Sequence, residues 1–251
     1  MPLDVHQFPC LNDNYGFLVR DRASGAVGCI DTPDAEAILA ELGQLGWRLT
    51  TIINTHWHPD HAGGNERLKA ETGCAIVGPP EVTRIAPLDR PVAEGDVVEL
   101  GDTRLKVLET GGHTLGHLSY YDEADGIVFV GDTLFALGCG RLFEGTAEQM
   151  WTSLGKLAAL PDETLVYCAH EYTASNARFA LSVDDSPALK TRADQVFAAR
   201  QRGEPTVPTS IGAEKAANPF LRAPRLKAGE GAPSEAQAFA AVRRAKDAFK
   251  G

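Results

Sequence analysis

Residues 55–61 have the sequence Thr-His-Trp-His-Pro-Asp-His, so seven positions carry three imidazoles and one carboxylate directly after an apolar run. Histidine and aspartate are side chains that hold zinc, iron or manganese in proteins. The side chains of His56 and His58 point the same way as long as this segment is extended. The proline that follows forces a turn and aims Asp60 and His61 in another direction. The motif therefore predicts two groups of metal ligands, whereas a surface histidine tract would lack the apolar strand in front of it.

The length and charge of the chain exclude several classes of protein. At 251 residues, 43% of them hydrophobic, the chain suits one large domain or a main domain with an appendage. The net charge of −10 argues against nucleic acid, which binds basic surfaces, and means that an anionic substrate needs arginine or lysine placed locally. No apolar stretch approaches the ~20 residues of a membrane-spanning helix. We therefore expect a monomer that binds a small molecule and neither nucleic acid nor membrane.

The cysteines indicate a reducing compartment. They are odd in number, widely spread and without a Cys-x-x-Cys pair, at positions 10, 29, 74, 139 and 168. This distribution is typical of reduced thiols rather than of a disulfide framework or a zinc site. The N-terminus has neither the basic segment nor the long apolar segment of a secretory signal. We therefore expect a cytoplasmic protein.

Strand patterns alternate with helix patterns as far as residue 172, and only helix patterns follow. Apolar runs rich in β-branched residues predict strands over residues 15–20, 27–30, 49–53, 75–77, 104–108, 118–121, 127–130 and 165–168. Apolar periodicity and two capping boxes predict helices over 34–45, 65–72, 147–160, 174–183, 187–202 and 235–249. The Pro- and Gly-containing stretch 203–212 predicts a loop. We expect an α/β protein with a metal-binding domain over residues 1–172 and a helical domain over 173–251.

Three further metal-competent side chains come shortly after predicted strands: His113, Asp132 and His170. Ligands collect at the carboxyl ends of strands, because rigid strands aim the loops that follow them. One such residue would be ordinary, but four strands that end this way indicate a shared metal centre. His6 follows no predicted strand and is expected to be an ordinary surface or packing residue. His117 begins a strand and is expected to support the ligands rather than to bind metal.

The order of these motifs resembles the metallo-β-lactamase superfamily. Thr-His-x-His-x-Asp-His is followed by Gly-His-Thr-x-Gly-His, by Gly-Asp-Thr-Leu-Phe and by a late histidine, and the resemblance covers residues 1–172. It implies a four-layer αββα sandwich. It also implies that one metal is bound by His56, His58 and His113, a second by Asp60, His61 and His170, and that Asp132 bridges the two. Seven ligands are too many for one tetrahedral zinc but suit a dinuclear site.

Four further segments resemble the hydroxyacylglutathione hydrolase (glyoxalase II) family, so the resemblance runs the length of the chain. They are residues 138–146, 169–173, 218–225 and 241–247. The resemblance implies that glutathione is bound by Arg141, Phe143, Tyr172, Arg222 and Arg225. Lysine also occurs in the family at the position of Arg141, and tyrosine at that of Phe143. Phe143 therefore lacks a hydroxyl hydrogen bond, and Arg141 keeps the charge of lysine with a different geometry.

This resemblance implies a thioester hydrolase that cleaves S-2-hydroxyacylglutathione. The substrate would be S-D-lactoylglutathione and the products glutathione and D-lactate, which is the second step of methylglyoxal detoxification. A hydroxide held by two divalent metals would attack the carbonyl, while Asp60 and Asp132 hold the metals and orient the hydroxide. We expect zinc, with iron or manganese as alternatives, because mixed His and Asp ligation suits all three metals. The leaving thiolate, with a pKa of ~8.5, needs no strong general acid.

Two other classes of function remain as alternatives. A glutathione persulfide dioxygenase, a mononuclear iron oxidoreductase of the same superfamily, has similar metal motifs but a shorter C-terminal tail. The helical appendage with residues 218–225 argues against it. A non-catalytic metal-binding module would need neither a complete ligand set nor a separate substrate-binding segment. A β-lactamase or lactonase fits the fold but leaves the glutathione-type residues unexplained.

Overall fold

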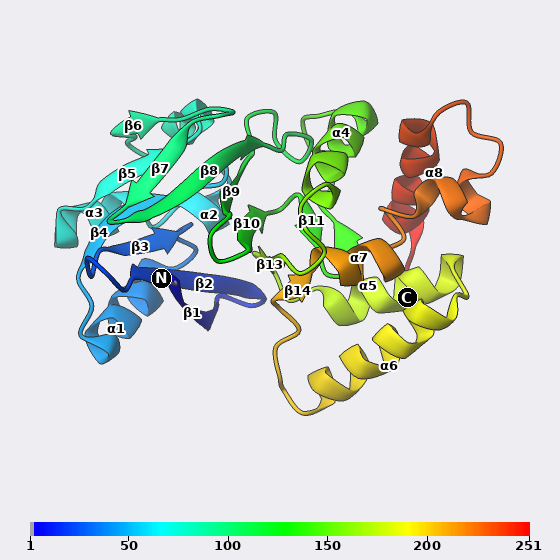
Figure 1. Cartoon of the computed structure of the whole chain (residues 1–251), viewed down its shortest axis with the longest axis horizontal. Helices are drawn as coiled ribbons and strands as arrows, with labels where there is room; N and C mark the ends of the chain where they lie inside the picture. The colour runs from blue at the N-terminus through cyan, green and yellow to red at the C-terminus, as the bar shows by residue number, and fades with distance from the viewer. Residues whose placement is uncertain (1–2) are drawn as a thin grey trace. The chain divides into compact units, whose positions relative to one another are not determined.

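The computed structural model describes residues 3–251, whose contacts form two compact units (Figure 1). The first unit comprises the chain as far as Glu109 together with Gly116–Gly131. The second comprises Thr110–Leu115 and Asp132–Gly251. No helix in this described part of the chain is long and apolar enough to cross a bilayer.

A six-stranded sheet forms the first half of the first unit. Its strands, in spatial order, are β1 (Leu3–Cys10), β2 (Asn14–Asp21), β3 (Val27–Ile30), β4 (Leu49–Ile53), β5 (Ala75–Gly78) and β6 (Arg90–Pro91). The pairs β1–β2 and β2–β3 are antiparallel, and β3 to β6 run parallel to one another. Parallel neighbours need crossover connections, which contain α1 (Ala35–Leu45), α2 (Pro59–Ala62), α3 (Asn65–Thr72) and the 3₁₀ turn η1 (Pro80–Arg84).

Helices α1 and α3 cover one face of this sheet. The carboxylate of Asp34 accepts two N–H groups of the first turn of α1, and Gly46 ends the helix in the left-handed region with φ of 64°. Ile38 of α1 and Leu68 of α3 pack in one buried cluster with strand residues such as Ile52. This packing fixes β4, the strand that leads into the histidine motif.

A second sheet of the first unit packs against the other face. It contains the antiparallel strands β7 (Val97–Leu100), β8 (Thr103–Glu109), β9 (Leu118–Asp122) and β10 (Ile127–Gly131). The rings of Phe17 and Phe129, one from each sheet, have centroids 5.8 Å apart. The hydroxyl of Tyr120 donates to the carbonyl oxygen of Asn54 at 2.6 Å. The two sheets therefore face each other across an apolar layer that contains a satisfied hydrogen bond.

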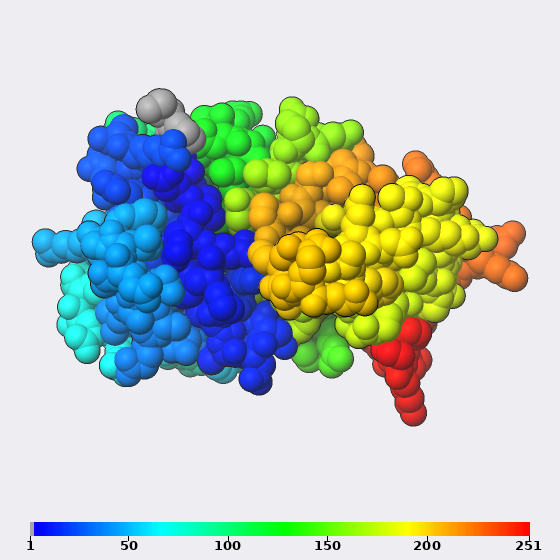
Figure 2. All heavy atoms as spheres, turned by 90° about the horizontal axis from the view of Figure 1, so that it is seen from below, coloured from blue at the N-terminus to red at the C-terminus, as the bar shows by residue number. Residues whose placement is uncertain are grey.

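The second unit is mainly helical. Its helices are α4 (Ala147–Ala158), α5 (Thr173–Val183), α6 (Pro187–Gln201), α7 (Ile211–Ala217) and α8 (Glu235–Ala248), with 3₁₀ turns η2 (Ala223–Arg225) and η3 (Lys227–Gly229). Strands β11 (Leu134–Phe135) and β12 (Gly138–Cys139) form a hairpin, and β13 (Leu165–Cys168) pairs antiparallel with β14 (Thr209–Ser210). Leu137, at the hairpin tip, packs with Ala180 of α5 and with Leu189 and Val196 of α6. Figure 2 shows α6 (yellow) at the surface of this unit.

The structure confirms the predicted strands and helices but adds elements that were not predicted. Strand β1 contains His6, which was expected to follow no strand and whose Nε2 lies 2.8 Å from a carboxylate oxygen of Glu41. Strand β7 was also missed. The loop prediction over 203–212 is wrong for its last four residues, because Thr209 pairs with β13 and Ser210 caps α7.

Candidate metal centre and substrate cavity

The first unit gathers the imidazoles of the 55–61 motif at the end of β4. Strand β4 ends at Ile53, the chain bends at Thr55, and α2 begins at Pro59, where the proline predicted a turn. The Nε2 of His56 lies 3.0 Å from the Nδ1 of His58. The rings of His56 and His61 have centroids 4.0 Å apart. His58 and His61, from the two predicted groups of ligands, therefore both lie next to the buried ring of His56.

Buried Asp31 orients His61. Its carboxylate oxygens accept hydrogen bonds from the backbone N–H and the hydroxyl of Thr55, both at 2.7 Å, and from the Nδ1 of His61 at 2.8 Å. Because Nδ1 donates here, Nε2 of His61 is the atom left to bind a metal. Ligand atoms of Asp31, His56 and His61 all lie within 4.8 Å of one another. Sequence reasoning missed Asp31, although an aspartate directly after the predicted strand 27–30 was a usable signal.

Asp60 and His117 complete the surroundings of these imidazoles. The side-chain amide of Asn14 donates to a carboxylate oxygen of Asp60 at 3.2 Å, and that oxygen lies 3.5 Å from Nε2 of His61. The buried ring of His117 stacks on His56 with centroids 4.9 Å apart. The ring of His117 thus lies against a predicted ligand, and its supporting role stays a prediction.

In the second unit, Asp132 lies between two imidazoles. Its Oδ2 is 3.4 Å from Nε2 of His113, and its Oδ1 is 3.4 Å from Nε2 of His170. The Nδ1 of His113 donates to the carbonyl oxygen of Arg141 at 2.9 Å, which leaves Nε2 as the ligand atom. All three predicted ligands have buried side chains. Each carboxylate oxygen thus faces a different histidine, which is the arrangement that a bridging carboxylate requires.

The donor atoms in both units fit divalent metal ions. A separation of 3.4 Å is longer than a typical hydrogen bond. It matches the roughly 3.4 Å between two ligand atoms that each lie about 2.1 Å from a tetrahedral metal. Imidazole nitrogens whose other nitrogen is hydrogen-bonded, together with buried carboxylates, are the usual ligand set for zinc, iron and manganese. The seven predicted ligands are divided between the units: His56, His58, Asp60 and His61 in the first, and His113, Asp132 and His170 in the second.

A cavity of about 430 Å³ in the second unit joins His113 and Asp132 to a group of cations and aromatic rings. It is lined by His113, Asp132, Phe135, Cys139, Arg141, Phe143, Tyr172, Ser175, Asn176, Arg243 and Lys246. Three predicted substrate residues are among them. Arg243 and Lys246 were not named from the sequence, although both lie within the segment 241–247 that carried the family resemblance. Their spacing places them on one face of α8.

The cations give this cavity a positive charge in an acidic protein. Burial and, after it, the neighbouring charges of Arg243, Arg178 and Arg141 together lower the pKa of Lys246 to about 8. Arg243 is buried, donates to the carbonyl oxygen of Cys139 at 3.1 Å and pairs with Asp247 at 2.7 Å. Arg243 is buried, Lys246 is half-buried and Arg141 is exposed. Cations clustered in this way repel one another, which favours the binding of an anionic ligand.

Two aromatic side chains of the cavity lie beside its histidines. Tyr172 stacks on His170, with centroids 4.7 Å apart and an interplanar angle of 2°. Phe143 is 62% exposed and meets His113 edge-on at 5.2 Å. An exposed ring beside a ligand histidine offers an apolar surface for a bound molecule.

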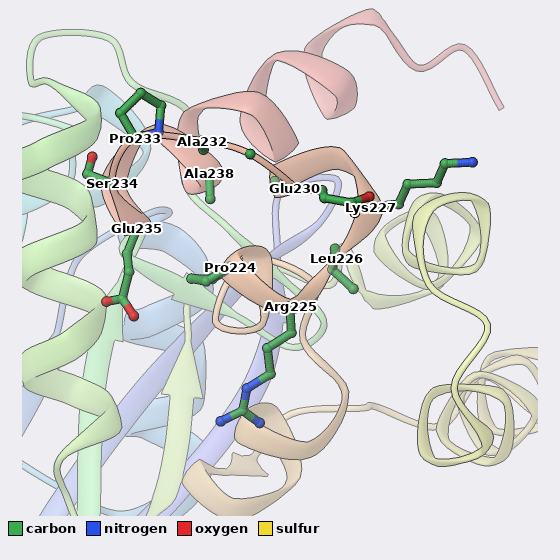
Figure 3. A pocket seen from close by; sticks show the side chains of 12 residues that line it. Pro224, Arg225, Leu226, Lys227, Glu230, Ala232, Pro233, Ser234, Glu235 and Ala238 are labelled. Carbon is green, nitrogen blue, oxygen red and sulfur yellow. The ribbon is translucent and has the colours of Figure 1, made fainter.

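The structure does not place Arg222 and Arg225 in this cavity. Arg222 donates from Nε to a carboxylate oxygen of Asp184 at 3.0 Å and from Nη1 to the carbonyl oxygen of Ala216 at 2.8 Å. Arg225 lines a different, open cavity between η2 and the start of α8 (Figure 3). Of the five predicted substrate residues, the structure therefore brings together Arg141, Phe143 and Tyr172 only.

Two family models cover almost the whole chain. That of the metallo-beta-lactamase superfamily matches residues 27–170, and that of the hydroxyacylglutathione hydrolase C-terminus matches residues 171–249. The chain belongs to the hydroxyacylglutathione hydrolase family. Relatives in this family include the hydroxyacylglutathione hydrolase of Maricaulis maris, 57% identical over 98% of both chains. Another is the hydroxyacylglutathione hydrolase of Erythrobacter litoralis, 51% identical over 98% of this chain and 100% of that one.

Solved structures confirm the fold predicted for this member of the hydroxyacylglutathione hydrolase family. ETHE1 from Myxococcus xanthus matches with a TM-score of 0.70 and 29% identity, over 96% of this chain and 90% of that chain. TTHA1623 in a di-iron-bound form matches with a TM-score of 0.63 and 25% identity, over 87% and 100%. The α/β fold of the metallo-β-lactamase type with a C-terminal helical region is thus confirmed. The dioxygenase alternative is less well supported, because relatives at 48–57% identity are hydrolases by name.

Proposed function

We propose that this protein hydrolyses S-2-hydroxyacylglutathione thioesters, S-D-lactoylglutathione among them, to glutathione and a 2-hydroxy acid. One observation carries the proposal: a single cavity joins the metal-competent pair His113 and Asp132 to three cations. A glutathione thioester has one carboxylate at each end of the tripeptide and carries its acyl group on the sulfur of the central cysteine. The cavity offers cations for the carboxylates and the pair His113 and Asp132 for the thioester. The names of the relatives in the family support the same reaction.

The cations of the cavity bind the tripeptide in this proposal. Lys246 and Arg141 reach the carboxylates through charge-assisted hydrogen bonds, while Arg243 is held by Asp247 and Cys139 and adds fixed positive charge. Tyr172 and Phe143 pack along the peptide on the side of the histidines. These contacts are the same for the substrate and the transition state, so they lower KM rather than raise kcat.

Membership of the superfamily and the clusters of histidine and aspartate support binding of divalent metal. We propose two ions, zinc in the first place with iron or manganese as alternatives. One would be held by His56, His58 and His113, the second by Asp60, His61 and His170, with Asp132 between them. When bound, such ions polarise a carbonyl oxygen and lower the pKa of water towards ~7.

The protein's own groups prepare the ligands for this task. Asp31 accepts a hydrogen bond from the Nδ1 of His61, and the carbonyl oxygen of Arg141 accepts one from the Nδ1 of His113. The proton of each ring is therefore on Nδ1, and Nε2 can bind a metal without losing a proton. The two oxygens of Asp132 face separate histidines, which suits the bridging role. In this proposal, Asp132 and Asp60 are the catalytic carboxylates. A thiolate with a pKa of ~8.5 leaves without a strong acid beside it.

Four further features stay proposals of ours. We propose a metal-binding domain over residues 1–172 and a helical substrate-binding domain over 173–251. The five cysteines are all free and buried, which supports a cytoplasmic location. We also propose a monomer. Arg222 and Arg225 stay predicted substrate contacts, although Arg222 would have to exchange its pairing with Asp184 for the substrate.

The test is a hydrolysis assay on metal-analysed protein. Purified protein reconstituted with zinc, iron or manganese should release thiol from S-D-lactoylglutathione and contain two metal ions per chain. Removal of the metal by a chelator should abolish the release, and zinc should restore it. Protein that contains two ions per chain and releases no thiol would contradict the proposed reaction.

A further inference from the structure

The β11–β12 hairpin carries part of the cavity wall in a backbone conformation that needs support. Its two strands contribute Phe135 and Cys139 to the cavity. Leu137, between the strands, has φ of 56°, in the left-handed region that branched residues rarely adopt. Such a conformation persists only where the surroundings hold it in place.

Two fully buried polar side chains hold this hairpin. The N–H of Leu137 donates to Oε2 of Glu214 in α7 at 2.7 Å. The amide of Asn218, just after α7, donates to the carbonyl oxygens of Phe135 at 3.1 Å and of Gly138 at 2.9 Å. It also donates to Oε2 of Glu214 at 2.9 Å. We call Glu214 and Asn218 together the hairpin clamp.

The second carboxylate oxygen of Glu214 in the hairpin clamp also accepts a hydrogen bond. The hydroxyl of Thr209 in β14 donates to Oε1 of Glu214 at 2.6 Å. Both clamp residues have no exposed surface. A buried carboxylate is costly to maintain in an apolar region, and an apolar residue of similar volume often stabilises such a site better. The presence of this network therefore calls for a role other than stability.

The clamp acts on the cavity through one aromatic ring. Phe135, whose carbonyl oxygen the clamp holds, meets the ring of His170 edge-on at 5.9 Å and 83°. It meets the ring of Tyr172 in the same way at 5.5 Å and 82°. A change in the hairpin backbone would therefore move a ring that supports both a metal ligand and a wall of the cavity.

We propose that Glu214 and Asn218 are positioning residues for the thioester hydrolysis proposed above, on which this inference rests. Their hydrogen bonds keep the hairpin in its left-handed turn, and the hairpin in turn holds Phe135 against His170 and Tyr172. Glu214 and Asn218 thus determine the orientation of His170, a proposed metal ligand that lies outside the helical segment containing them. The expected signature is a joint loss of metal affinity and of glutathione affinity when the clamp is broken.

Variants of Glu214 test this directly. Glu214→Leu removes the acceptor of Leu137 and Asn218, so KM for S-D-lactoylglutathione should rise at least tenfold. The affinity for zinc, measured by competition with a chromophoric chelator, should fall at least tenfold, and hydrogen exchange in residues 134–139 should become faster. Glu214→Gln keeps an oxygen for both donors and can donate to Thr209, so all three quantities should stay within about threefold of the wild type. Asn218→Ala leaves the hydrogen bond between Leu137 and Glu214 in place. This variant should therefore change KM, zinc affinity and hydrogen exchange in the same direction as Glu214→Leu, but by less.

Leu157→Ala in α4 is the matched control. Leu157 is fully buried and belongs to the same unit but does not take part in the clamp, so this variant lowers stability without changing KM or zinc affinity. If Glu214→Leu or Asn218→Ala lowers Tm like Leu157→Ala but keeps wild-type KM and zinc affinity, the network is only structural and the inference is wrong. If the wild type does not cleave the thioester, the proposed function fails, whereas zinc affinity and hydrogen exchange still decide on the clamp.

Discussion

Replacement of Lys246 by methionine should separate substrate binding from catalysis. Methionine keeps the length of the apolar stem of lysine but lacks the ammonium group, which lines the cavity with Arg141 and Arg243. One charge-assisted hydrogen bond to a carboxylate contributes about 1.5–3 kcal/mol, so KM for S-D-lactoylglutathione should rise roughly ten- to a hundredfold. The value of kcat should change little, because the contact is the same in substrate and transition state.

The same replacement should make the protein more stable at neutral pH. A fall of the lysine pKa from 10.5 to about 8 corresponds to a cost of at most about 3 kcal/mol, and solvent screening of this half-buried group leaves about 1–2 kcal/mol. The folded pKa lies below the unfolded one, so this cost is fully present below pH 8. It disappears as the pH rises from about 8 to 10.5. Lys246→Met should therefore unfold at higher denaturant concentration than the wild type at pH 7, and the difference should vanish above pH 10.5.

Arg244 provides the control for this experiment. It is the exposed cation on the same helix that does not line the cavity. Arg244→Met should leave both KM and stability close to the wild type, since a surface charge contributes little. If Lys246→Met lowers kcat at unchanged KM, or if Arg244→Met raises KM as much, the assignment of Lys246 to glutathione is wrong.

Three other predictions concern the same site. Asp132→Ala removes the carboxylate between His113 and His170, so kcat should fall far more than KM rises, and metal analysis should find fewer than two ions per chain. A variant with normal kcat and full metal content would contradict the bridging role. Arg222→Ala removes the cationic partner of the buried Asp184 carboxylate, which keeps its hydrogen bonds from Ser186, so urea unfolding should show a loss of about 1–3 kcal/mol, and KM should rise less than in Lys246→Met. In the wild type, KM should increase as the pH rises through about 8, because Lys246 loses its charge, whereas Lys246→Arg should keep KM nearly constant from pH 7 to 9. Equal pH profiles for the two proteins would assign the change to another group.

The strand ends that carry the metal ligands could be predicted from the sequence. The runs of β-branched and apolar residues before positions 56, 132 and 170 predicted strands, and they became β4, β10 and β13. The order of the motifs supplied the fold, which periodicity alone could not, because alternation does not reveal how many sheets a set of strands forms.

Strands with weak local patterns were missed. Strand β1 has the sequence Leu-Asp-Val-His-Gln-Phe-Pro-Cys, whose proline and polar residues disfavour a strand, and it lies at the edge of its sheet. Strand β14 has only two residues and exists because Leu165 and Val166 of β13 pair with it. In both cases long-range pairing decides a structure that the local sequence leaves open.

The cations of the cavity show a similar limit. Arg222, Arg225, Arg243 and Lys246 all lie in segments that carried the family resemblance, but only the first two were predicted to bind substrate. The packing of α8 on Cys139 and Ser175 brings Arg243 and Lys246 to the cavity. The sequence therefore predicted a need for local positive charge and one of the cations that line the cavity, Arg141, but not the two that α8 supplies.

The most direct test of the proposed function compares two thioesters on the zinc-loaded protein. One is S-D-lactoylglutathione, and the other is a lactoyl thioester of a small thiol that lacks the tripeptide. The proposal predicts release of glutathione and D-lactate from the first, with kcat/KM at least a hundredfold higher than for the second, and loss of most of this difference in Lys246→Met. Equal kcat/KM for both thioesters, unchanged by Lys246→Met, would contradict a glutathione-specific hydrolase.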